Sequence, residues 1–595
     1  MKGSIFLIPH QYHINMNSHK FLRFIVGCLV IVATVKYFFS PSSSSGRVEK
    51  IIQGSGFWSQ HRIPPLNLVD NQIDPLKKEQ PQQPSTDRLE VHPKKPASVL
   101  SNQEELHLEV KQAPDDNTMA APFKIVHLDL KGAAPKVKYL EQIFPLLSSL
   151  GANGILLEYE DMFPYEGELA ILKSSFAYSP EDIEEIKSLA KRNQLELIPL
   201  VQVFGHLEFV LKHEKYFSLR EVAEYPNSIN SLAQGSLELV KEMLTQVMKK
   251  HPESKWFHIG ADEVRGLGES EDSKRWLEAN SGDMGKLFLN HVVAVGHFMT
   301  KMRPEIRLIL WDDMFRKFSS NSIQESGLQR LASPMIWNYL PNMDVDEIGN
   351  LISKYEQAGF QGVWFASAFK GASGIDQRWT PIDQHLKNHL QWLKVIASMP
   401  QYKSISFSGI AVTGWQRYEH HTVLCELLPV AIPSLAVCLQ TLKYGSFNNK
   451  ARSELQHIVG CEIQLHKNDC KGKSFPGSDI YDMVKKINNN LESSIKKIMT
   501  SYHVRGSFSS YHRKRNFANP RNLGFFKDSL KKLLDEWDSF LLTFRQSMEA
   551  IYYPDTLEEW LEENVNEHIE RLHEMVIDVE RIIKLNGQPK MDQTS

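Results

Sequence analysis

Several signatures that would narrow the function of this chain are scarce or missing from its 595 residues. The five cysteines form no C-x-x-C pair and no cluster with histidine at zinc-ligand spacing, which argues against a metal site or a disulfide framework. Cys461 and Cys470 lie close enough in sequence to pair, but pairing requires an oxidising compartment. Lysine and arginine form no dominant basic stripe and the formal net charge is −3, so we expect no nucleic acid as a partner.

Long apolar runs are also scarce, and the main one lies close to the N-terminus. Residues 24–35 carry no charge, and with its basic flanks the run reaches the length of about 20 residues that a spanning helix needs. We expect a single-pass type II membrane protein of the Golgi or secretory pathway with a lumenal catalytic domain; the alternatives are a cleaved signal peptide or a buried helix. The predicted segments are a short basic tail (1–20), a signal anchor (21–39) and a flexible Ser/Pro/Gln-rich stem (40–120).

The chain contains no Asn-x-Ser/Thr sequon, the acceptor site for N-linked glycans. This absence is unusual for a large lumenal domain, although it does not exclude the lumen. A second location therefore stays open, the cytoplasm or nucleus, for a form of the protein that lacks the anchor.

From residue 122 onward the sequence alternates between strand-like and helix-like segments. Short runs of β-branched and apolar residues are separated by stretches of helical period, a pattern typical of βα units around a parallel sheet. Eight such units predict an α/β fold, a (β/α)8 TIM barrel over residues 121–445, in which the connection between the fifth and sixth strands is the least clearly helical. The expected strands are residues 124–131, 154–160, 195–202, 255–262, 307–313, 334–339, 362–369 and 404–415.

Residues 446–595 follow the barrel and predict a C-terminal helical region. Apolar residues recur with helical period in 525–544 and 556–584, which predicts amphipathic helices packed on the barrel or on a second subunit. Packing on a second subunit would make the protein a homodimer. The stretch 461–478 is expected to be a loop.

Acidic, basic and aromatic residues collect at the C-terminal ends of the predicted strands. In a (β/α)8 barrel these ends form the active face, so side chains far apart in sequence are expected to meet there. Asp and Glu accept hydrogen bonds from sugar hydroxyls, and Trp and Tyr pack on a pyranose ring, so the combination indicates a sugar pocket. The residues concerned are Asp129, Lys131, Glu158, Glu160, His206, Asp262, Glu263, Trp311, Asp312, Asp313, Trp337, Tyr339 and Trp415.

The stretch KWFHIGADEV, residues 255–264, ends a predicted strand in two adjacent carboxylates. Each disfavours ionisation of the other and burial disfavours both, so the pair is costly to place. Successive residues of a regular strand face opposite ways, so Asp262 and Glu263 can share a pocket only where the strand bends or ends. Glycosidases usually place two carboxylates on either side of the scissile bond, and an adjacent pair needs a different division of labour.

HIGADE, residues 258–263, resembles the His-x-Gly-x-Asp-Glu signature of the family 20 glycoside hydrolases, the β-N-acetylhexosaminidases. Other stretches similar to this family are HLDLKGAAPK, LLEYEDMFPYEG, VFGHLEFVLKH, WDDM, ASAFKGASG and TGWQRYEHHTVLCELLP. The resemblance implies exo-acting hydrolysis of terminal β-linked N-acetylhexosamine (GalNAc, GlcNAc or both) from glycans or glycoconjugates, with no cofactor and no metal. It also implies that the acetamido oxygen of the substrate is the nucleophile, which gives an oxazolinium ion and retention of configuration.

The same resemblance implies a role for each site residue. Asp262 would stay ionised, orient the acetamide and stabilise the oxazolinium charge. Glu263 would have a raised pKa, protonate the leaving oxygen and then deprotonate the incoming water. Tyr339 would hydrogen-bond the acetamide, and His206 would support the acid. The expected substrate-binding residues are Tyr339, Trp311, Asp312, Trp337, Trp415, His206, Asp129 and Glu158.

Two positions depart from the lysosomal members of this family. The arginine that clamps sugar hydroxyls in those members is replaced by Lys131, which cannot form a planar fork. Their Trp-Gly-Glu near the last strand is replaced by WQRYE, so the acid that contacts the outer hydroxyls is Glu419 or another carboxylate such as Glu158. Both changes leave the preference for galacto or gluco sugars open.

Less specific roles stay open for several of these residues. Asp129 could cap the next segment, Glu158 and Glu160 could form structural ion pairs, and His258 and Trp364 could belong to the barrel core. A retaining glycosidase of another type would need a second carboxylate as nucleophile, for which Glu158 is the candidate. A non-catalytic carbohydrate-binding relative would be expected to have lost the acid pair, which is intact here.

Overall fold

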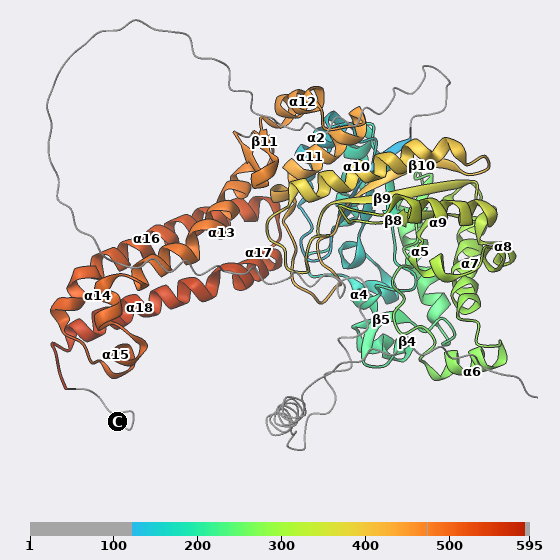
Figure 1. Ribbon diagram of the computed structural model, residues 1–595. Coiled ribbons are helices and arrows are strands. Elements are labelled where there is room, and N and C mark those ends of the chain that lie inside the picture. The colour runs from blue at the N-terminus through green and yellow to red at the C-terminus, as the bar shows by residue number, and fades with distance from the viewer. Residues whose placement is uncertain (1–121, 473, 590–595) are drawn as a thin grey trace, which may run out of the picture. The chain divides into compact units, whose positions relative to one another are not determined.

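Eight parallel strands close into a barrel in the computed structural model, which describes residues 122–472 and 474–589 (Figure 1). The strands follow one another around the barrel in chain order, and the last one pairs with the first. Each lies where the sequence predicts a strand, so the predicted (β/α)8 barrel is confirmed. The strands are β1 (Phe123–Asp129), β2 (Gly154–Glu158), β3 (Glu196–Leu200), β6 (Trp256–His258), β7 (Arg307–Trp311), β8 (Ala332–Trp337), β9 (Gly362–Lys370) and β10 (Ser406–Gly414).

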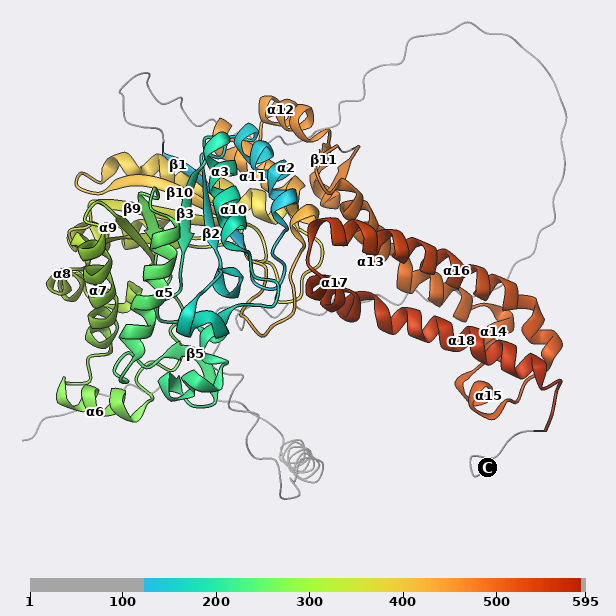
Figure 2. The same ribbon diagram turned by 180° about the vertical axis from the view of Figure 1, so that it is seen from behind.

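Amphipathic helices cover the outside of the barrel, as the view from behind also shows (Figure 2). In α3 (Pro180–Arg192) a capping box starts the helix, because the side chains of Ser179 and Asp182 each accept a hydrogen bond from the other residue's N–H. Ile183 and Ile186 then form the buried face. The other covering helices are α2 (Val137–Ser149), α5 (Ser236–Lys250), α7 (Met284–Met302), α8 (Ser320–Ser326), α9 (Val345–Gln357), α10 (Ile382–Ser398) and α11 (Leu428–Tyr444), of which the short α8 connects the fifth and sixth barrel strands.

Large side chains fill the inside of the barrel. Trp364 is fully buried and its ring packs 5.7 Å from the ring of Phe123 and 5.0 Å from that of Trp256. The predicted core position of Trp364 is therefore confirmed. Because the interior is a packed core, a substrate can enter only at the ends of the barrel, where the loops begin.

The connection between β3 and β6 carries an inserted hairpin. After the single-turn α4 (Glu208–Leu211), β4 (Arg220–Val222) pairs antiparallel with β5 (Tyr225–Ile229). The amide of Asn227 on β5 donates a hydrogen bond of 2.9 Å to the buried Glu208, and its carbonyl oxygen accepts one of 3.2 Å from the backbone N–H of Arg265. The hairpin thereby supports the loop that follows β6.

The C-terminal residues form the predicted helical region, in which α13, α16 and α18 run side by side (Figures 1 and 2). Two contacts join it to loops of the barrel: the hydroxyl of Thr556 donates to the carbonyl oxygen of Gly132 at 2.8 Å, and Arg417 forms an ion pair with Glu559. The contact with the barrel loops is thus made through α17, while α13, α16 and α18 pack on one another and extend away from the barrel (Figures 1 and 2), and a homodimer stays a prediction. The elements are α12 (Asn449–Val459), α13 (Ser478–Met499), α14 (Tyr502–Ser507), α15 (Ser510–Arg515), α16 (Pro520–Ile551), α17 (Pro554–Leu561) and α18 (Glu567–Lys584).

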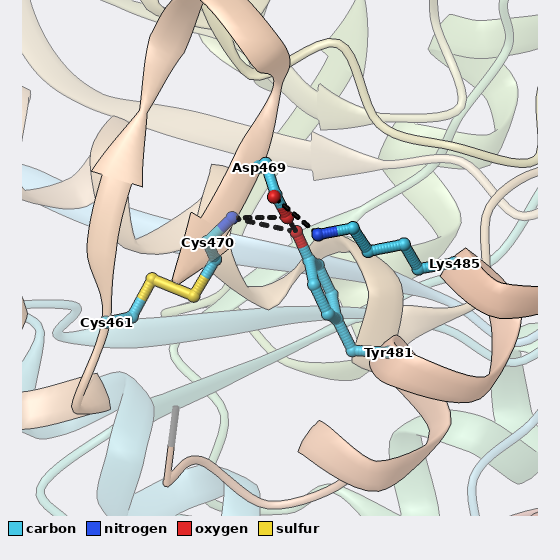
Figure 3. The surroundings of a disulfide bond; sticks show 5 residues. All are labelled: Cys461, Asp469, Cys470, Tyr481 and Lys485. Carbon is cyan, nitrogen blue, oxygen red and sulfur yellow. Dashed lines mark hydrogen bonds and ion pairs between the residues drawn. A yellow bond between two sulfur atoms is a disulfide. The ribbon is translucent and has the colours of Figure 1, made fainter. Parts of the chain in front are cut away.

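The stretch predicted as a loop between Cys461 and residue 478 contains a small hairpin instead. β11 (Glu462–Gln464) pairs antiparallel with β12 (Asp469–Lys471), and a disulfide joins Cys461 to Cys470 (Figure 3). Asp469 accepts hydrogen bonds from the Tyr481 hydroxyl at 3.0 Å and from Lys485 at 2.5 Å, which attaches the hairpin to α13. The two free cysteines among the described residues, Cys425 and Cys438, are buried.

The prediction of a single-pass type II membrane protein needs correction. Within residues 122–472 and 474–589, no helix combines the length and the apolar character needed to cross a membrane. The predicted anchor, 21–39, and the tail and stem on either side of it lie outside the described residues. We therefore withdraw the assignment to a membrane protein and the lumenal location that depended on it.

Candidate active site

The backbone leaves the strand conformation before it reaches the two carboxylates. β6 ends at His258 rather than at Asp262 as predicted. Gly260, Ala261 and Glu263 then adopt left-handed φ values of 60°, 66° and 41°. Such values cost a non-glycine residue about 1–3 kcal/mol and are found at functional sites. This bend supplies the break in strand geometry that Asp262 and Glu263 need to share one pocket.

Two glycines make room for the bend. A Cβ atom on Gly205, in the loop after β3, would lie 2.1 Å from the backbone carbonyl oxygen of Asp262. One on Gly260 would lie 2.0 Å from the side-chain oxygen of Gln202. Both distances are far shorter than any van der Waals contact. At Gly205 only glycine lets the two backbone segments approach so closely, and at Gly260 a Cβ would displace the side chain of Gln202.

His206 lies between the two carboxylates. Its Nε2 atom is 3.6 Å from Oδ2 of Asp262 and 3.4 Å from Oε2 of Glu263, so both acids face the same imidazole. On the other side of Asp262, the amide of Gln202 donates a hydrogen bond of 2.9 Å to Oδ1. The structure thus brings together His206, Asp262 and Glu263 as predicted from sequence.

The charges of these three groups depend on one another. Burial lowers the pKa of His206, but the carboxylate of Asp262 and the hydrogen bond to Glu263 outweigh it and raise this pKa to about 10. Burial raises the pKa of Glu263, but His206 and Arg265 outweigh it and lower this pKa to about 2. At Asp262 burial dominates and raises the pKa. The raised pKa expected for Glu263 is therefore wrong for the enzyme without substrate, because sequence does not show that two cations converge on it.

Arg265 is the second cation at Glu263, and it is not among the site residues predicted from the sequence. Its Nη2 atom donates to Oε2 of Glu263 at 2.8 Å and to the hydroxyl of Tyr418 at 2.5 Å. Its guanidinium also lies 5.6 Å from the centre of the Tyr418 ring, within the range of a cation–π contact. A bridge therefore joins the loop after β6 to the loop after β10, next to the acid pair.

Asp313 rather than Asp312 belongs to the site. The carboxylate of Asp313 accepts the backbone N–H of Glu263 at 2.9 Å and the indole N–H of Trp337 at 3.2 Å. Burial, with the nearby charge of Asp262, raises the pKa of Asp313 to about 7. Asp312, predicted to bind substrate, is instead fully buried and bound by Arg316 and Tyr355.

The four predicted aromatic residues form one group beside the acids. Trp337 stacks on Tyr339 with ring centres 5.3 Å apart, and the ring of Tyr339 lies 6.4 Å from that of Trp415. Trp311 lies 5.7 Å from Trp415 and packs on His258 at 4.4 Å. Trp311 and Tyr339 are 1% and 8% exposed, whereas Trp337 and Trp415 are partly exposed, so this group forms an apolar lining whose accessible surface comes mainly from the latter two. His258 is a fully buried barrel residue, as expected.

Lys131 is buried among three carboxylates at the ends of β1 and β2. Its Nζ atom lies 3.5 Å from Asp129, 3.5 Å from Glu158 and 3.1 Å from Glu160, and 5.8 Å from the centre of the Trp415 ring. Burial opposes ionisation of Glu158, but Lys131 and the hydrogen bond to His127 lower its pKa, whereas burial dominates at Glu160 and raises its pKa to about 8. These carboxylates therefore form the ion pairs named as their structural alternative.

Asp129 holds two loops together. One carboxylate oxygen accepts the backbone N–H of Lys131 at 3.0 Å, and the other accepts the backbone N–H of Gln416 at 2.8 Å. Gln416 directly follows Trp415, so Asp129 fixes the loop that carries this tryptophan. The capping alternative for Asp129 describes these contacts better than direct binding of substrate.

Comparisons with known proteins show which family the sequence resembles. Residues 142–363 match the glycosyl hydrolase family 20 catalytic domain. The chain is 44% identical over 469 residues to hexosaminidase D of Homo sapiens, covering 78% of this chain and 96% of that protein. It is 51% identical over 338 residues to hexosaminidase D of Bos taurus, covering 57% of this chain and 97% of that protein.

Two bacterial enzymes are among the solved structures that match this chain. The GH20 exo β-N-acetylglucosaminidase of Vibrio harveyi in complex with N-acetylglucosamine is 17% identical, with a TM-score of 0.41 over 57% of this chain and 58% of that one. The β-N-acetylhexosaminidase of Bacteroides fragilis is 15% identical, with a TM-score of 0.39 over 53% of this chain and 65% of that one. On the sequence relationships above, the chain belongs to glycosyl hydrolase family 20 and is a glycoside hydrolase of the β-N-acetylhexosaminidase type.

Proposed function

We propose that the enzyme removes terminal β-linked N-acetylhexosamine, GalNAc or GlcNAc, from the ends of glycans, with retention and with the substrate's own acetamido group as nucleophile. The observation that carries this proposal is the placement of Asp262 and Glu263 on one imidazole, His206. Both acids are held by this one imidazole, so we assign them to the same end of the reacting bond and assign the nucleophile to the acetamido group of the substrate, as in the substrate-assisted families. An intact acid pair also disfavours a non-catalytic relative.

Glu158 is unsuited to act as a nucleophile of the protein. It is 1% exposed, one of its oxygens accepts a hydrogen bond of 3.0 Å from His127, and the other faces Lys131 at 3.5 Å. A carboxylate with both oxygens engaged and no open face cannot attack an anomeric carbon. This arrangement supports the acetamido oxygen as the nucleophile.

In the first step, the acetamido oxygen attacks the anomeric carbon and the bond to the leaving oxygen breaks. Asp262 accepts the acetamide N–H and stabilises the positive charge of the oxazolinium ion. Gln202 holds Oδ1 of Asp262 in place from behind at 2.9 Å. Tyr339, beside Trp337 and Trp415, is the proposed hydrogen-bond donor to the acetamide oxygen.

Glu263 transfers the proton. In the free enzyme the proton rests on His206, whose pKa is about 10, while Glu263 is ionised. A bound sugar excludes water from this pair, which favours the neutral forms, so the proton moves to Glu263 and from there to the leaving oxygen. Glu263 then takes a proton from the water that attacks the oxazolinium, which restores the configuration.

The test uses the full chain with aryl N-acetyl-β-galactosaminide and N-acetyl-β-glucosaminide. We expect release of the aryl alcohol from at least one of them, and loss of about 100- to 10,000-fold in kcat/KM for these substrates in Asp262→Asn. Glu263→Gln should show a loss of that size with a disaccharide, whose leaving group needs the proton. The corresponding sugars that lack the acetamido group should not react. Equal turnover of those sugars would rule out the acetamido nucleophile, and the ratio of the two acetamido substrates measures the galacto or gluco preference.

A further inference from the structure

Arg265 and Tyr418 form a polar constellation that the proposed reaction does not use. Arg265 reaches Oε2 of Glu263 and the Tyr418 hydroxyl with a single nitrogen, Nη2. Its backbone N–H is held by Asn227 on the inserted hairpin at 3.2 Å, so its starting point is fixed as well. Three separate segments of the chain thus converge next to the catalytic acid.

The location of Arg265 and Tyr418 relative to Glu263 shows on which side of the pocket they lie. The terminal sugar belongs in the aromatic lining near Asp262, whose side chain is 11% exposed. The side chains of Glu263 and Arg265 are each 21% exposed, so the site opens toward solvent in this direction. Since Glu263 must reach the glycosidic oxygen, whatever is attached beyond that oxygen extends past Glu263 to Arg265 and Tyr418.

Arg265 also has donors to spare. An arginine carries five N–H donors, and those on Nε and Nη1 have no hydrogen-bond partner among the described residues. A guanidinium that is largely enclosed must find acceptors for these groups in water or in a ligand. Sugar hydroxyls and ring oxygens are suitable acceptors, whereas an aromatic ring offers only a weak contact to an N–H group.

We propose that Arg265 and Tyr418 form the binding site for the leaving group, and that this site takes a sugar rather than an aryl or simple alkyl alcohol. When substrate binds, Arg265 moves its hydrogen bond from Glu263 to this sugar. The inference rests on the proposed function, because it takes Glu263 as the proton donor. It adds a coupling between the leaving sugar and the proton donor Glu263. The sugar needs a proton to depart, and the same sugar draws the cation of Arg265 away from Glu263.

The coupling follows from charge balance. With Arg265 bound to it, Glu263 resists protonation. Once the sugar takes the guanidinium, the proton of His206 passes to Glu263 and then to the leaving oxygen, as the acetamido oxygen forms its bond to the anomeric carbon. An aryl leaving group departs as a stabilised anion and depends little on this transfer.

The test compares two substrates with the same terminal sugar: 4-nitrophenyl N-acetyl-β-glucosaminide and the β-linked disaccharide of N-acetylglucosamine, or the matching GalNAc pair if that sugar reacts faster. The readout is the ratio of kcat/KM for the disaccharide to that for the aryl glycoside. Arg265→Gln and Arg265→Lys should lower this ratio at least tenfold, because neither keeps the planar fork. Tyr418→Phe should lower it about threefold, the typical effect of one lost hydrogen bond.

Arg275→Gln is the matched control, since Arg275 lies on α6 (Glu271–Ala279), is mostly exposed and pairs with Asp272. It should keep the wild-type ratio. A second readout is the partition of the oxazolinium between water and an added sugar acceptor, which does not depend on the amount of folded enzyme. Arg265→Gln should lower the share transferred to the sugar.

Two results would overturn the inference while leaving the proposed function intact. In one, Arg265→Gln slows both substrates by the same factor, so that Arg265 serves neither the leaving sugar nor the proton transfer to it. In the other, the ratio and the partition both stay at their wild-type values. Failure of the wild-type enzyme to cleave any acetamido sugar would instead overturn the proposed function, and this inference with it.

Discussion

Asp312 and Asp313 are neighbours in the chain, but their carboxylates serve different parts of the molecule. Arg316 donates to both oxygens of Asp312, at 2.8 and 2.6 Å, and the Tyr355 hydroxyl adds a third hydrogen bond of 2.8 Å. Asp313 instead accepts the backbone N–H of Glu263 at 2.9 Å. The first acid fastens the loop after β7 to α9, and the second holds the catalytic loop.

Substitution of Asp312 should therefore act on stability. Asp312→Asn leaves the partly buried guanidinium of Arg316 without its charged partner, which costs about 1.5–3 kcal/mol. We expect a clearly lower midpoint in urea or thermal unfolding, with kcat/KM per folded molecule reduced much less. A variant with wild-type stability and lost activity would show that Asp312 contacts substrate after all.

Substitution of Asp313 should act on the reaction. An asparagine offers one oxygen, so its NH2 group must face either the N–H of Glu263 or the indole N–H of Trp337, two donors that Asp313 now satisfies together. Asp313→Asn should displace the acid and lower kcat by at least tenfold while binding of a product sugar, measured by calorimetry, changes little. Unchanged kcat would contradict this role.

The pH profile should reveal where the catalytic proton rests. His206 holds it in the free enzyme with a pKa raised to about 10, so the wild-type activity should persist until the pH approaches that value. In His206→Gln only Glu263 can carry the proton, and Arg265 still favours its ionised form. The alkaline limb of kcat/KM for a disaccharide should then shift by several pH units toward acid.

This shift distinguishes a His206 that holds the catalytic proton from a His206 that makes only a structural contact. Loss of a mere structural contact would lower the whole profile without moving its limbs. A parallel profile with an aryl glycoside of a good leaving group serves as the control, because its departure needs little protonation and its alkaline limb should move less.

Gly205 should be essential although its own backbone has no chemical role. Alanine at this position places a Cβ atom against the carbonyl oxygen of Asp262, and the backbone of one of the two loops must move. Because a displacement of about 1 Å at reacting groups can cost 100-fold in rate, Gly205→Ala should lose at least that factor in kcat/KM. Gly524→Ala is the control for an added methyl group, because Gly524 has no left-handed φ and no atom lies within 4 Å of the added Cβ. A Gly205→Ala enzyme with normal activity would contradict the close approach.

The disulfide should stabilise its hairpin locally. Closing a loop of about ten residues contributes about 3 kcal/mol by loss of entropy in the open form. Reductant should therefore speed hydrogen exchange at the amides of β11 and β12, while exchange in the barrel strands stays slow. The double variant Cys461→Ala, Cys470→Ala should exchange fast with or without reductant, and equal protection of the reduced and oxidised wild type would contradict the expectation.

The barrel was predictable because its signal is local. Each strand is a short apolar run that alternates with a helical pattern, and the position of the acid pair at a strand end follows from the same reading. The bend after His258 was predicted only as a requirement, since the left-handed residues Ala261 and Glu263 have no local sequence signal. Strand ends themselves were less certain, and β6 is shorter than expected.

The partners of the acids were not predictable in the same way. Arg265 lies two positions after Glu263, where strand or loop geometry alone does not direct it back to the carboxylate, and Tyr418 is far away in sequence. The wrong choice of Asp312 over Asp313 has the same origin, because the orientation of two neighbouring acids depends on Arg316 and Tyr355. The charge of Glu263 depends on its own partners, which is why its pKa is lowered although the sequence predicted that it would be raised.

The contacts between the barrel loops and residues Thr556 and Glu559 determine when, during synthesis of the chain, the active side of the barrel can be completed. The loop after β1 is held through Gly132, and the loop after β10 through Arg417. During synthesis both loops leave the ribosome long before the residues that hold them. The barrel strands can pair while translation continues, but the catalytic face reaches its final form only when the last helices have emerged, so an unfinished chain carries a fold without a finished enzyme.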